Sequence, residues 1–579
     1  MLRRNITHDG ARMTTITRLR VGDEAFLVAS MIERCPRSMM IRELLKNAQE
    51  AAAEAPAPRV EFSAITVEGA RKLVLWNTGR GLTAEELYRM CDIASSVNKR
   101  TGLDGNFGMG AKVASLPSNQ HGMRYRSCRD GVVHQVILGK RDGIYGRVHQ
   151  PGADGRPTEI IDATAAARAE GRDIGLDWTE VVLLGNRADQ DTVADPYDGH
   201  PRSGPAWLVE AIGARFFRFP AGQQVMLAPG LAGQPGRYAL RSAAQRLAAL
   251  PHYERVALPA GVAIHYAYDA PAPDRPGVNA SHASGLESAE GMGGVVFQNE
   301  IYGALRAHHW RREAPGFGVP TGARHVSILV ELPDGFPVQA EGYREALRHR
   351  GGVQPLVRML DFAAQVAENL PLWLKAILAE NSPAGALAEE VQRQMAALLE
   401  EMGVVRRRPP RQRLSDRQAP AAPRPPGPPQ PPGAAPAPTF ESAPDLILLR
   451  SPGEIADAGL AHRAACYYPE SHQLHVNMAY PAVPRLAAML TGSAPGEETH
   501  PAMQAAAQSV AERAMVLRVA RALVHALDKR GRPAEWNDVH MRTLMSPESL
   551  TLAADDIHTG LPEAREGFRA AMAEGDAAD

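Results

Sequence analysis

Hydrophobic residues recur with helical spacing in the segment IRELLKNAQEAA, residues 41–52. The apolar side chains that share one face are Ile41, Leu44, Leu45 and Ala48. Glu43 and Asn47 are four residues apart, so their side chains lie one turn above each other beside this stripe. The pattern therefore predicts an amphipathic helix that carries a carboxylate and an amide next to its buried face.

Apolar runs that end in glycine or polar residues predict buried strands further along the chain. In the first part they are KLVLWNTGRG (72–81), VVHQVILGKR (132–141) and WTEVVLLGN (178–186). In the second part they lie at 261–270, 293–303 and 323–333, with helical patterns between them. Because both kinds of pattern alternate, we expect an α+β or α/β fold, with domains at residues 1–190 and 191–350.

The remaining chain divides by composition. Residues 351–405 have a helical pattern, whereas residues 406–440 are rich in proline and arginine and are expected to form a semi-rigid spacer. The arginines that open the spacer could contact nucleic acid, although a solvated linker flank is the simpler reading. Residues 441–579 contain a strand pattern at 472–481 and a long helical pattern at 502–527. We expect a mixed C-terminal domain with an interaction or dimerisation role.

Composition excludes several classes of protein. The net charge of the 579 residues is -1, so it indicates neither nucleic acid nor membrane binding. Cys35, Cys91, Cys128 and Cys466 are widely scattered and show no zinc-ligand spacing. The N-terminal segment lacks the apolar core of a signal peptide, and no run of about 18 apolar residues occurs. We therefore expect a cytoplasmic protein without a membrane partner.

Three further motifs follow the helix at 41–52. NTGRGL (77–82) ends the first apolar strand, GLDGNFGMGAKVASL (102–116) is a glycine-rich loop that runs into a helical pattern, and Thr179 opens a strand. Each motif alone is weak, because glycine turns and glycine-rich loops are common. Together they suit a phosphate ligand: glycine lets backbone N–H groups approach closely, and the helix that follows presents its N-terminus to the same charge.

In this order and at these spacings the motifs resemble the GHKL superfamily of ATPases, which includes gyrase B subunits, the large heat-shock chaperone, MutL, MORC proteins and histidine kinases. The resemblance covers about residues 25–187 and is closest to the chaperone and MORC branches, whose helix motif reads much like RELIxNxxDA. It implies a two-layer, Bergerat-type ATP-binding domain, followed by a transducer-like domain. It also implies ATP and Mg²⁺ as cofactors, Glu43 as the general base and Asn47 as the metal ligand.

The resemblance extends to the residues around the nucleotide. Besides Asn47, it assigns to nucleotide binding Asn77, Gly79, Gly81, Lys99, Gly105, Asn106, Phe107, Gly108, Met109, Gly110, Ala111, Lys112 and Thr179. Residues 83–104 correspond to the ATP lid of the family, in which Lys99 could reach a phosphate or remain solvated. Lys112 likewise could contact a phosphate or remain solvated. Thr179 matches the threonine near adenine but could be an ordinary strand threonine, and a solvated helix edge is the alternative for Glu43 and Asn47.

The chain departs from the family pattern at two positions. The DxGxG motif of the family begins with Asp, whereas this chain has Asn77, whose neutral amide can still accept a hydrogen bond from the adenine amino group. No lysine lies between Lys140 and Lys375, so the phosphate-contacting lysine of gyrase and MutL has no counterpart there. The chaperone branch uses an arginine instead, which makes Arg344 the catalytic candidate. The alternatives are Arg348, Arg324, or a surface-helix position for Arg344.

We therefore expect a slow Mg²⁺-dependent ATPase whose nucleotide state switches the arrangement of its domains or of a homodimer. By analogy with relatives of this layout, it would be a clamp on DNA in repair, chromosome organisation or phage defence. A chaperone-like ATPase acting on protein clients and a non-hydrolysing nucleotide sensor are the alternatives. Stimulation of turnover by DNA favours the clamp, and stimulation by a client protein favours the chaperone.

Overall fold

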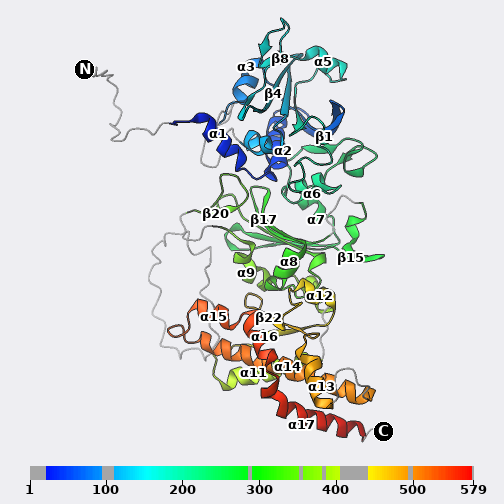
Figure 1. Ribbon diagram of the computed structural model, residues 1–579, viewed down its shortest axis with the longest axis vertical. Helices are drawn as coiled ribbons and strands as arrows, with labels where there is room; N and C mark the ends of the chain where they lie inside the picture. Colours follow the sequence, from blue (N-terminus) through cyan, green and yellow to red (C-terminus); the bar gives the residue numbers. More distant parts are fainter. Residues whose placement is uncertain are drawn as a thin grey trace, which may run out of the picture. The chain divides into compact units, whose positions relative to one another are not determined.

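The computed structural model describes residues 21–93, 110–284, 290–350, 356–380, 386–404, 441–492 and 500–576 (Figure 1). Contacts group the chain into two units. Unit 1 comprises Met1–Ile212, Phe219–Leu240 and Gly342–Arg344, and unit 2 comprises Gly213–Arg218, Arg241–Glu341 and Glu345–Asp579. Both units combine helices with strands, so the α+β class predicted from the sequence is confirmed.

Unit 1 is built on a nine-stranded sheet in the order β11-β10-β1-β2-β9-β3-β4-β5, with β8 beside β4. The strands are β1 (Arg59–Val67), β2 (Ala70–Thr78), β3 (Gly122–Arg129), β4 (Val132–Arg141), β5 (Ile144–Arg147), β8 (Ile160–Asp162), β9 (Trp178–Gly185), β10 (Gln224–Leu227) and β11 (Tyr238–Ala239). The strands predicted at 72–81, 132–141 and 178–186 are confirmed as β2, β4 and β9. The sheet extends beyond residue 190, because β10 pairs in parallel with β1.

The helix predicted at 41–52 is confirmed as α2 (Met39–Ala52), which packs on β1, β2 and α4 (Gly110–Ser115). Its apolar stripe is buried as predicted, and Leu45 is completely inaccessible. The other helices of the unit are α1 (Glu24–Glu33), α3 (Ala84–Met90), α5 (Thr164–Ala169) and α6 (Trp207–Gly213). Because the apolar stripe of α2 packs against the sheet, its polar residues lie at the edges of that stripe or on the opposite side of the helix.

Unit 2 contains a five-stranded sheet in the order β12-β13-β18-β16-β17. The strands are β12 (His252–Ala257), β13 (Ala263–Tyr268), β16 (Met292–Phe297), β17 (Glu300–Arg306) and β18 (Val326–Glu331). The single strand predicted over 293–303 is wrong, because the chain reverses there between β16 and β17. Gln298 and Asn299 both adopt positive φ, 50° and 63°, as a two-residue hairpin turn requires.

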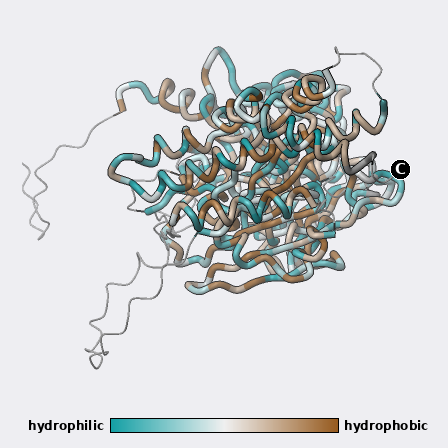
Figure 2. The backbone as a smooth tube through the Cα atoms, turned by 90° about the horizontal axis from the view of Figure 1, so that it is seen from below, coloured by the Kyte–Doolittle hydropathy of each residue, from teal (hydrophilic) through white to brown (hydrophobic). Residues whose placement is uncertain are grey.

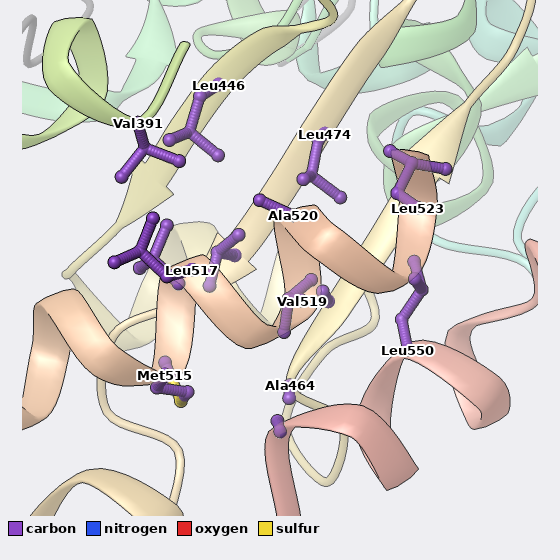
Figure 3. Close-up of a cluster of buried hydrophobic side chains, with 14 of the residues drawn as sticks. Val391, Leu446, Ala464, Leu474, Met515, Leu517, Val519, Ala520, Leu523 and Leu550 are labelled. Carbon is purple, nitrogen blue, oxygen red and sulfur yellow. The ribbon is translucent and has the colours of Figure 1, made fainter. Parts of the chain in front are cut away.

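The C-terminal part of unit 2 packs helices on a three-stranded sheet in the order β21-β23-β22. Its elements are α11 (Ala386–Glu401), β21 (Asp445–Leu449), β22 (Ala465–Tyr468), β23 (Gln473–Asn477), α13 (Ala482–Thr491), α14 (Pro501–Arg530), α16 (Pro547–Asp555) and α17 (Ile557–Asp576). The predicted strand at 472–481 and long helix at 502–527 are confirmed as β23 and α14. Figure 3 shows Val391 of α11 beside the side chains of this core, so α11 contributes to it.

Along the helices of Figure 2 the tube changes between hydrophilic and hydrophobic colours within each turn, as expected for helices with one buried face. The helical pattern predicted over 351–405 is confirmed where the chain is described, as α9 (Ala363–Glu368), α10 (Leu372–Glu380) and α11. The spacer at 406–440 lies outside the described residues. Within the described ranges, every helix is too short or too polar to cross a membrane.

Candidate functional site

A cavity of about 310 Å³ in unit 1 brings the predicted site residues together. The predicted residues that line it are Glu43, Asn47, Asn77, Gly79, Gly81, Gly110, Ala111, Lys112, Thr179 and Arg344. The predicted residues that lie outside the described part of the chain are Lys99, Gly105, Asn106, Phe107, Gly108 and Met109. The cavity therefore joins segments from α2, β2, α4 and β9 that are far apart in the sequence.

Helix α2 supplies Glu43 and Asn47 to one wall of the cavity. Asn47 is exposed, but Glu43 is only 8% exposed, so the solvated-edge alternative is wrong for Glu43. Its carboxylate forms an ion pair with the guanidinium of Arg42, the neighbouring residue, which is also buried. A buried carboxylate needs such a partner, because an isolated charge in this environment costs several kcal/mol or more.

Gly110, the first residue of α4, lies directly against the Glu43 carboxyl group. A Cβ atom at position 110 would stand 2.6 Å from Glu43 Cδ, well inside ordinary contact distance. Glycine at this position is therefore required for Glu43 to keep its place in the cavity wall.

The two glycines of NTGRGL are needed for close packing on both sides of the turn. A Cβ atom at Gly79 would stand 2.6 Å from the carbonyl oxygen of Ala51 in α2. A Cβ atom at Gly81 would stand 2.9 Å from the carbonyl carbon of Cys128 in β3, and Gly81 has a φ of 69°. The turn is thus held between α2 and β3, and it forms part of the cavity wall.

Asn77 and Thr179 lie opposite each other on the neighbouring strands β2 and β9. Asn77 is 5% exposed, and its amide nitrogen donates a hydrogen bond to the carbonyl of Thr78 (2.9 Å). Thr179 Oγ1 lies 2.9 Å from the hydroxyl of Ser127 on β3. Tyr125, also on β3, adds an aromatic ring to the cavity. The sequence pattern did not predict β3, so Tyr125 and Ser127 were missed.

Lys112 is buried, and the reading of this residue as a solvated lysine is wrong. Its ammonium group donates hydrogen bonds to the carbonyls of Met90 and Asp92, each at 2.5 Å, at the end of α3. Burial lowers the pKa of Lys112 to about 8. Among the described residues its ammonium group bonds these two carbonyls, so its third donor is available to a ligand in the cavity that Lys112 lines.

Arg344 lies in the turn between β19 (Val338–Ala340) and β20 (Leu347–His349), so its assignment to a surface helix is wrong. It has a φ of 57°, which is uncommon for a residue with a long side chain. Residues 342–344 group with unit 1 and line the cavity. The two alternative arginines bind elsewhere: Arg348 donates to Glu341 (2.5 Å), and Arg324 pairs with Asp457 (3.5 Å).

The cavity provides oxygen atoms that suit a magnesium ion. Most of the other ligands of such an ion would be water and phosphate oxygens. Glu43, Glu50, Glu54 and Asn47 all line the cavity. Within the described residues, no group of three or more His, Cys, Asp or Glu side chains is arranged to hold a metal ion. Magnesium is commonly bound through one or two protein oxygens together with substrate phosphates, so Asn47 fits that role.

Neither a family model nor a curated protein sequence matches this chain. Among solved structures, it is similar to the ATPase and transducer domains of DNA topoisomerase II from Balamuthia mandrillaris, with 12% sequence identity and a TM-score of 0.29. The alignment covers 57% of this chain and 81% of that one.

Proposed function

We propose that unit 1 binds ATP with Mg²⁺ and hydrolyses the nucleotide slowly. The observation that carries this proposal is the convergence of the helix 41–52, the glycine turn 77–82, the start of α4 and Thr179 on one cavity. The cavity volume of about 310 Å³ is within the range of small-molecule sites, at its lower end. A carboxylate, an amide, two close-packed glycines and an arginine all line this space.

Each polar residue has a distinct role in this proposal. Asn47 would hold Mg²⁺ through its amide oxygen, and the ion would supply positive charge at the phosphates. Glu43 orients and deprotonates the attacking water. Arg344 stabilises the charge on the terminal phosphate and senses its presence. Lys99 and residues 105–112 would contact the phosphates. Asn77 and Thr179 would contact the adenine base.

The ion pair between Arg42 and Glu43 supports a slow reaction. A carboxylate that is held by a guanidinium group must share or release that contact before it accepts a proton from water. The same ion pair favours a second candidate function, a nucleotide sensor that binds ATP without hydrolysing it. The two candidates differ in turnover but share the binding site.

The first test is phosphate release from Mg·ATP by the wild type, Glu43→Ala and Glu24→Ala, with nucleotide binding measured in parallel. Glu24 is the control, because it is an exposed glutamate of helix α1 in the same unit and does not line the cavity. We expect Glu43→Ala to bind ATP and lose turnover, whereas Glu24→Ala keeps both. Equal phosphate release by Glu43→Ala and the wild type would reject the base assignment. ATP binding without turnover in the wild type would favour the sensor.

We further propose that the nucleotide state switches the arrangement of a homodimer that acts as a clamp on DNA. The arginines at 406–413 of the spacer provide the sequence support for a nucleic-acid partner. The test adds double-stranded DNA, or an unfolded client protein, to the phosphate-release assay. DNA stimulation together with ATP-dependent dimerisation is expected, whereas stimulation by the client alone would favour a chaperone-like ATPase.

A further inference from the structure

A buried hydroxyl group lies behind the part of the cavity wall formed by Asn77 and Thr179. Ser127 is completely inaccessible, and its Oγ makes three contacts. It accepts a hydrogen bond from the backbone N–H of Leu82 (2.8 Å), donates one to the carbonyl of Trp178 (3.1 Å), and lies 2.9 Å from Thr179 Oγ1. Ser127 therefore connects the end of the glycine turn to the strand that carries Thr179.

The direction of the hydrogen bond between the two hydroxyls follows from the number of protons. A serine hydroxyl has one proton and two acceptor lone pairs. The Trp178 carbonyl can only accept, whereas Thr179 Oγ1 can donate or accept. All three contacts are therefore hydrogen bonds only when the Ser127 proton goes to the Trp178 carbonyl, with the Leu82 N–H on one lone pair. The remaining lone pair can only accept, so Thr179 donates its proton to Ser127. Thr179 Oγ1 then offers lone pairs, and no proton, to a ligand.

Asn77 presents a second acceptor beside Thr179. One N–H of its amide is used by the Thr78 carbonyl, and its amide oxygen accepts no hydrogen bond from any residue that the structure describes. Asn77 and Thr179 are register partners on adjacent antiparallel strands, so their side chains lie next to each other on the same face of the sheet. Both residues line the cavity. This part of the wall therefore presents two neighbouring acceptor oxygens.

We infer that Ser127 is a positioning residue that sets base selectivity by holding Thr179 as a hydrogen-bond acceptor. A wall with two acceptors favours a purine that carries an amino donor, such as the exocyclic amino group of adenine, over a purine that offers only ring nitrogen acceptors there. A buried acceptor that loses its donor carries the full cost of desolvation, which amounts to roughly tenfold in affinity or more. The inference rests on the proposed binding of ATP to this cavity.

The test compares the affinities of ATP and purine riboside triphosphate, which lacks the amino group and is otherwise the same. The wild type should prefer ATP by about tenfold or more. In Ser127→Ala, the Thr179 hydroxyl is free to rotate and can donate to a ring nitrogen, so the preference should fall to within about threefold. Thr179→Val removes the hydroxyl acceptor and should also reduce the preference.

Thr192 provides a matched control for the loss of a buried hydroxyl. It is completely inaccessible, accepts the N–H of Leu73 (2.9 Å) and donates to the carbonyl of Leu183 (2.8 Å), but it does not line the cavity. Thr192→Ala should therefore lower the melting temperature about as much as Ser127→Ala and leave the ATP preference intact.

The outcomes separate this inference from the proposed function. An unchanged preference in Ser127→Ala or in Thr179→Val, or a loss of preference in Thr192→Ala as well, would overturn the role of Ser127 while ATP binding stands. Equal wild-type affinity for both nucleotides would overturn it too. If the wild type binds neither nucleotide, the proposed function itself fails.

Discussion

Gly110→Ala tests whether the position of the Glu43 carboxylate controls turnover. The added methyl group would stand 2.6 Å from Glu43 Cδ, whereas carbon atoms in ordinary contact are about 3.5 Å apart or more. The carboxyl group must therefore move by about 1 Å. A misplacement of about 1 Å can cost roughly 100-fold in rate, which corresponds to about 2.7 kcal/mol in the activation free energy.

The backbone itself should tolerate this substitution. Gly110 does not adopt a positive φ, and alanine is the better helix former, so α4 should not be weakened. We therefore expect phosphate release to fall about 100-fold while ATP affinity changes only a few-fold, because an interaction made only in the transition state affects the rate and not binding. The assay is phosphate release at saturating Mg·ATP, with binding measured by titration calorimetry.

Gly204→Ala is the matched control, since Gly204 is exposed, has no atom within 4 Å of its added Cβ and has no positive φ. It should turn over ATP like the wild type. Wild-type turnover by Gly110→Ala would refute the reasoning, because the carboxylate would then not need its present position. A parallel fall in affinity and rate would instead indicate general damage to the site.

Three further predictions concern the metal, a buried lysine and a partly buried glutamate. Asn47→Ala should weaken ATP binding by at least about tenfold with Mg²⁺ and leave it unchanged without Mg²⁺; equal effects in calorimetry would remove Asn47 from the metal site. Lys72 is completely buried, and its ammonium donates to the carbonyls of Leu184 (2.9 Å), Ala188 (2.8 Å) and Gln190 (2.7 Å). Lys72→Met should therefore lower the free energy of unfolding by about 3 kcal/mol, and a loss below about 1 kcal/mol in chemical unfolding would contradict this account. Burial raises the pKa of Glu331, but hydrogen bonds from His265 and Arg218 outweigh it and bring the pKa down to about 2. The wild type should thus lose roughly 2 kcal/mol more stability than Glu331→Gln as the pH falls from about 4.5 to about 2, after allowance for solvent screening, and parallel pH profiles of the two proteins would contradict this.

Hydrophobic periodicity was sufficient to predict the elements that frame the cavity. The apolar stripe of α2 is buried, and so are most residues of the apolar runs of β2 and β9. The hydrophobic pattern of each element therefore matches its burial. The strand β3 was missed because its sequence, GMRYRSCR, contains three arginines and reads as solvent-exposed. Arg124 and Arg126 are nevertheless buried, since Glu180 and Glu170 neutralise them. A hydrophobic pattern cannot show that charges from distant parts of the chain pair in the fold.

The ion pair of Glu43 could not be predicted either. Residues i and i+1 on a helix normally point in different directions, so the adjacent Arg42 gave no sign of being its partner. In the structure both side chains are buried and form an ion pair, which lowers the cost of placing each charge away from water. The motif therefore predicted that Glu43 lines the cavity. The ion pair of its carboxylate depends on side-chain packing, which the motif does not specify.

Asn77 shows why a departure from a motif must be judged with its neighbours. Asparagine lacks the charge of the aspartate that begins the DxGxG motif of GHKL ATPases, although its amide oxygen can still accept a hydrogen bond. Its amide nitrogen, however, donates to the carbonyl of Thr78, a bond that a carboxylate cannot make. A carboxylate here would face that carbonyl oxygen with a negative charge, which offsets the gain of a charge-assisted bond to the adenine base. The amide thus donates to the backbone and still offers an oxygen beside Thr179, whose hydroxyl lies 2.9 Å from Ser127 Oγ.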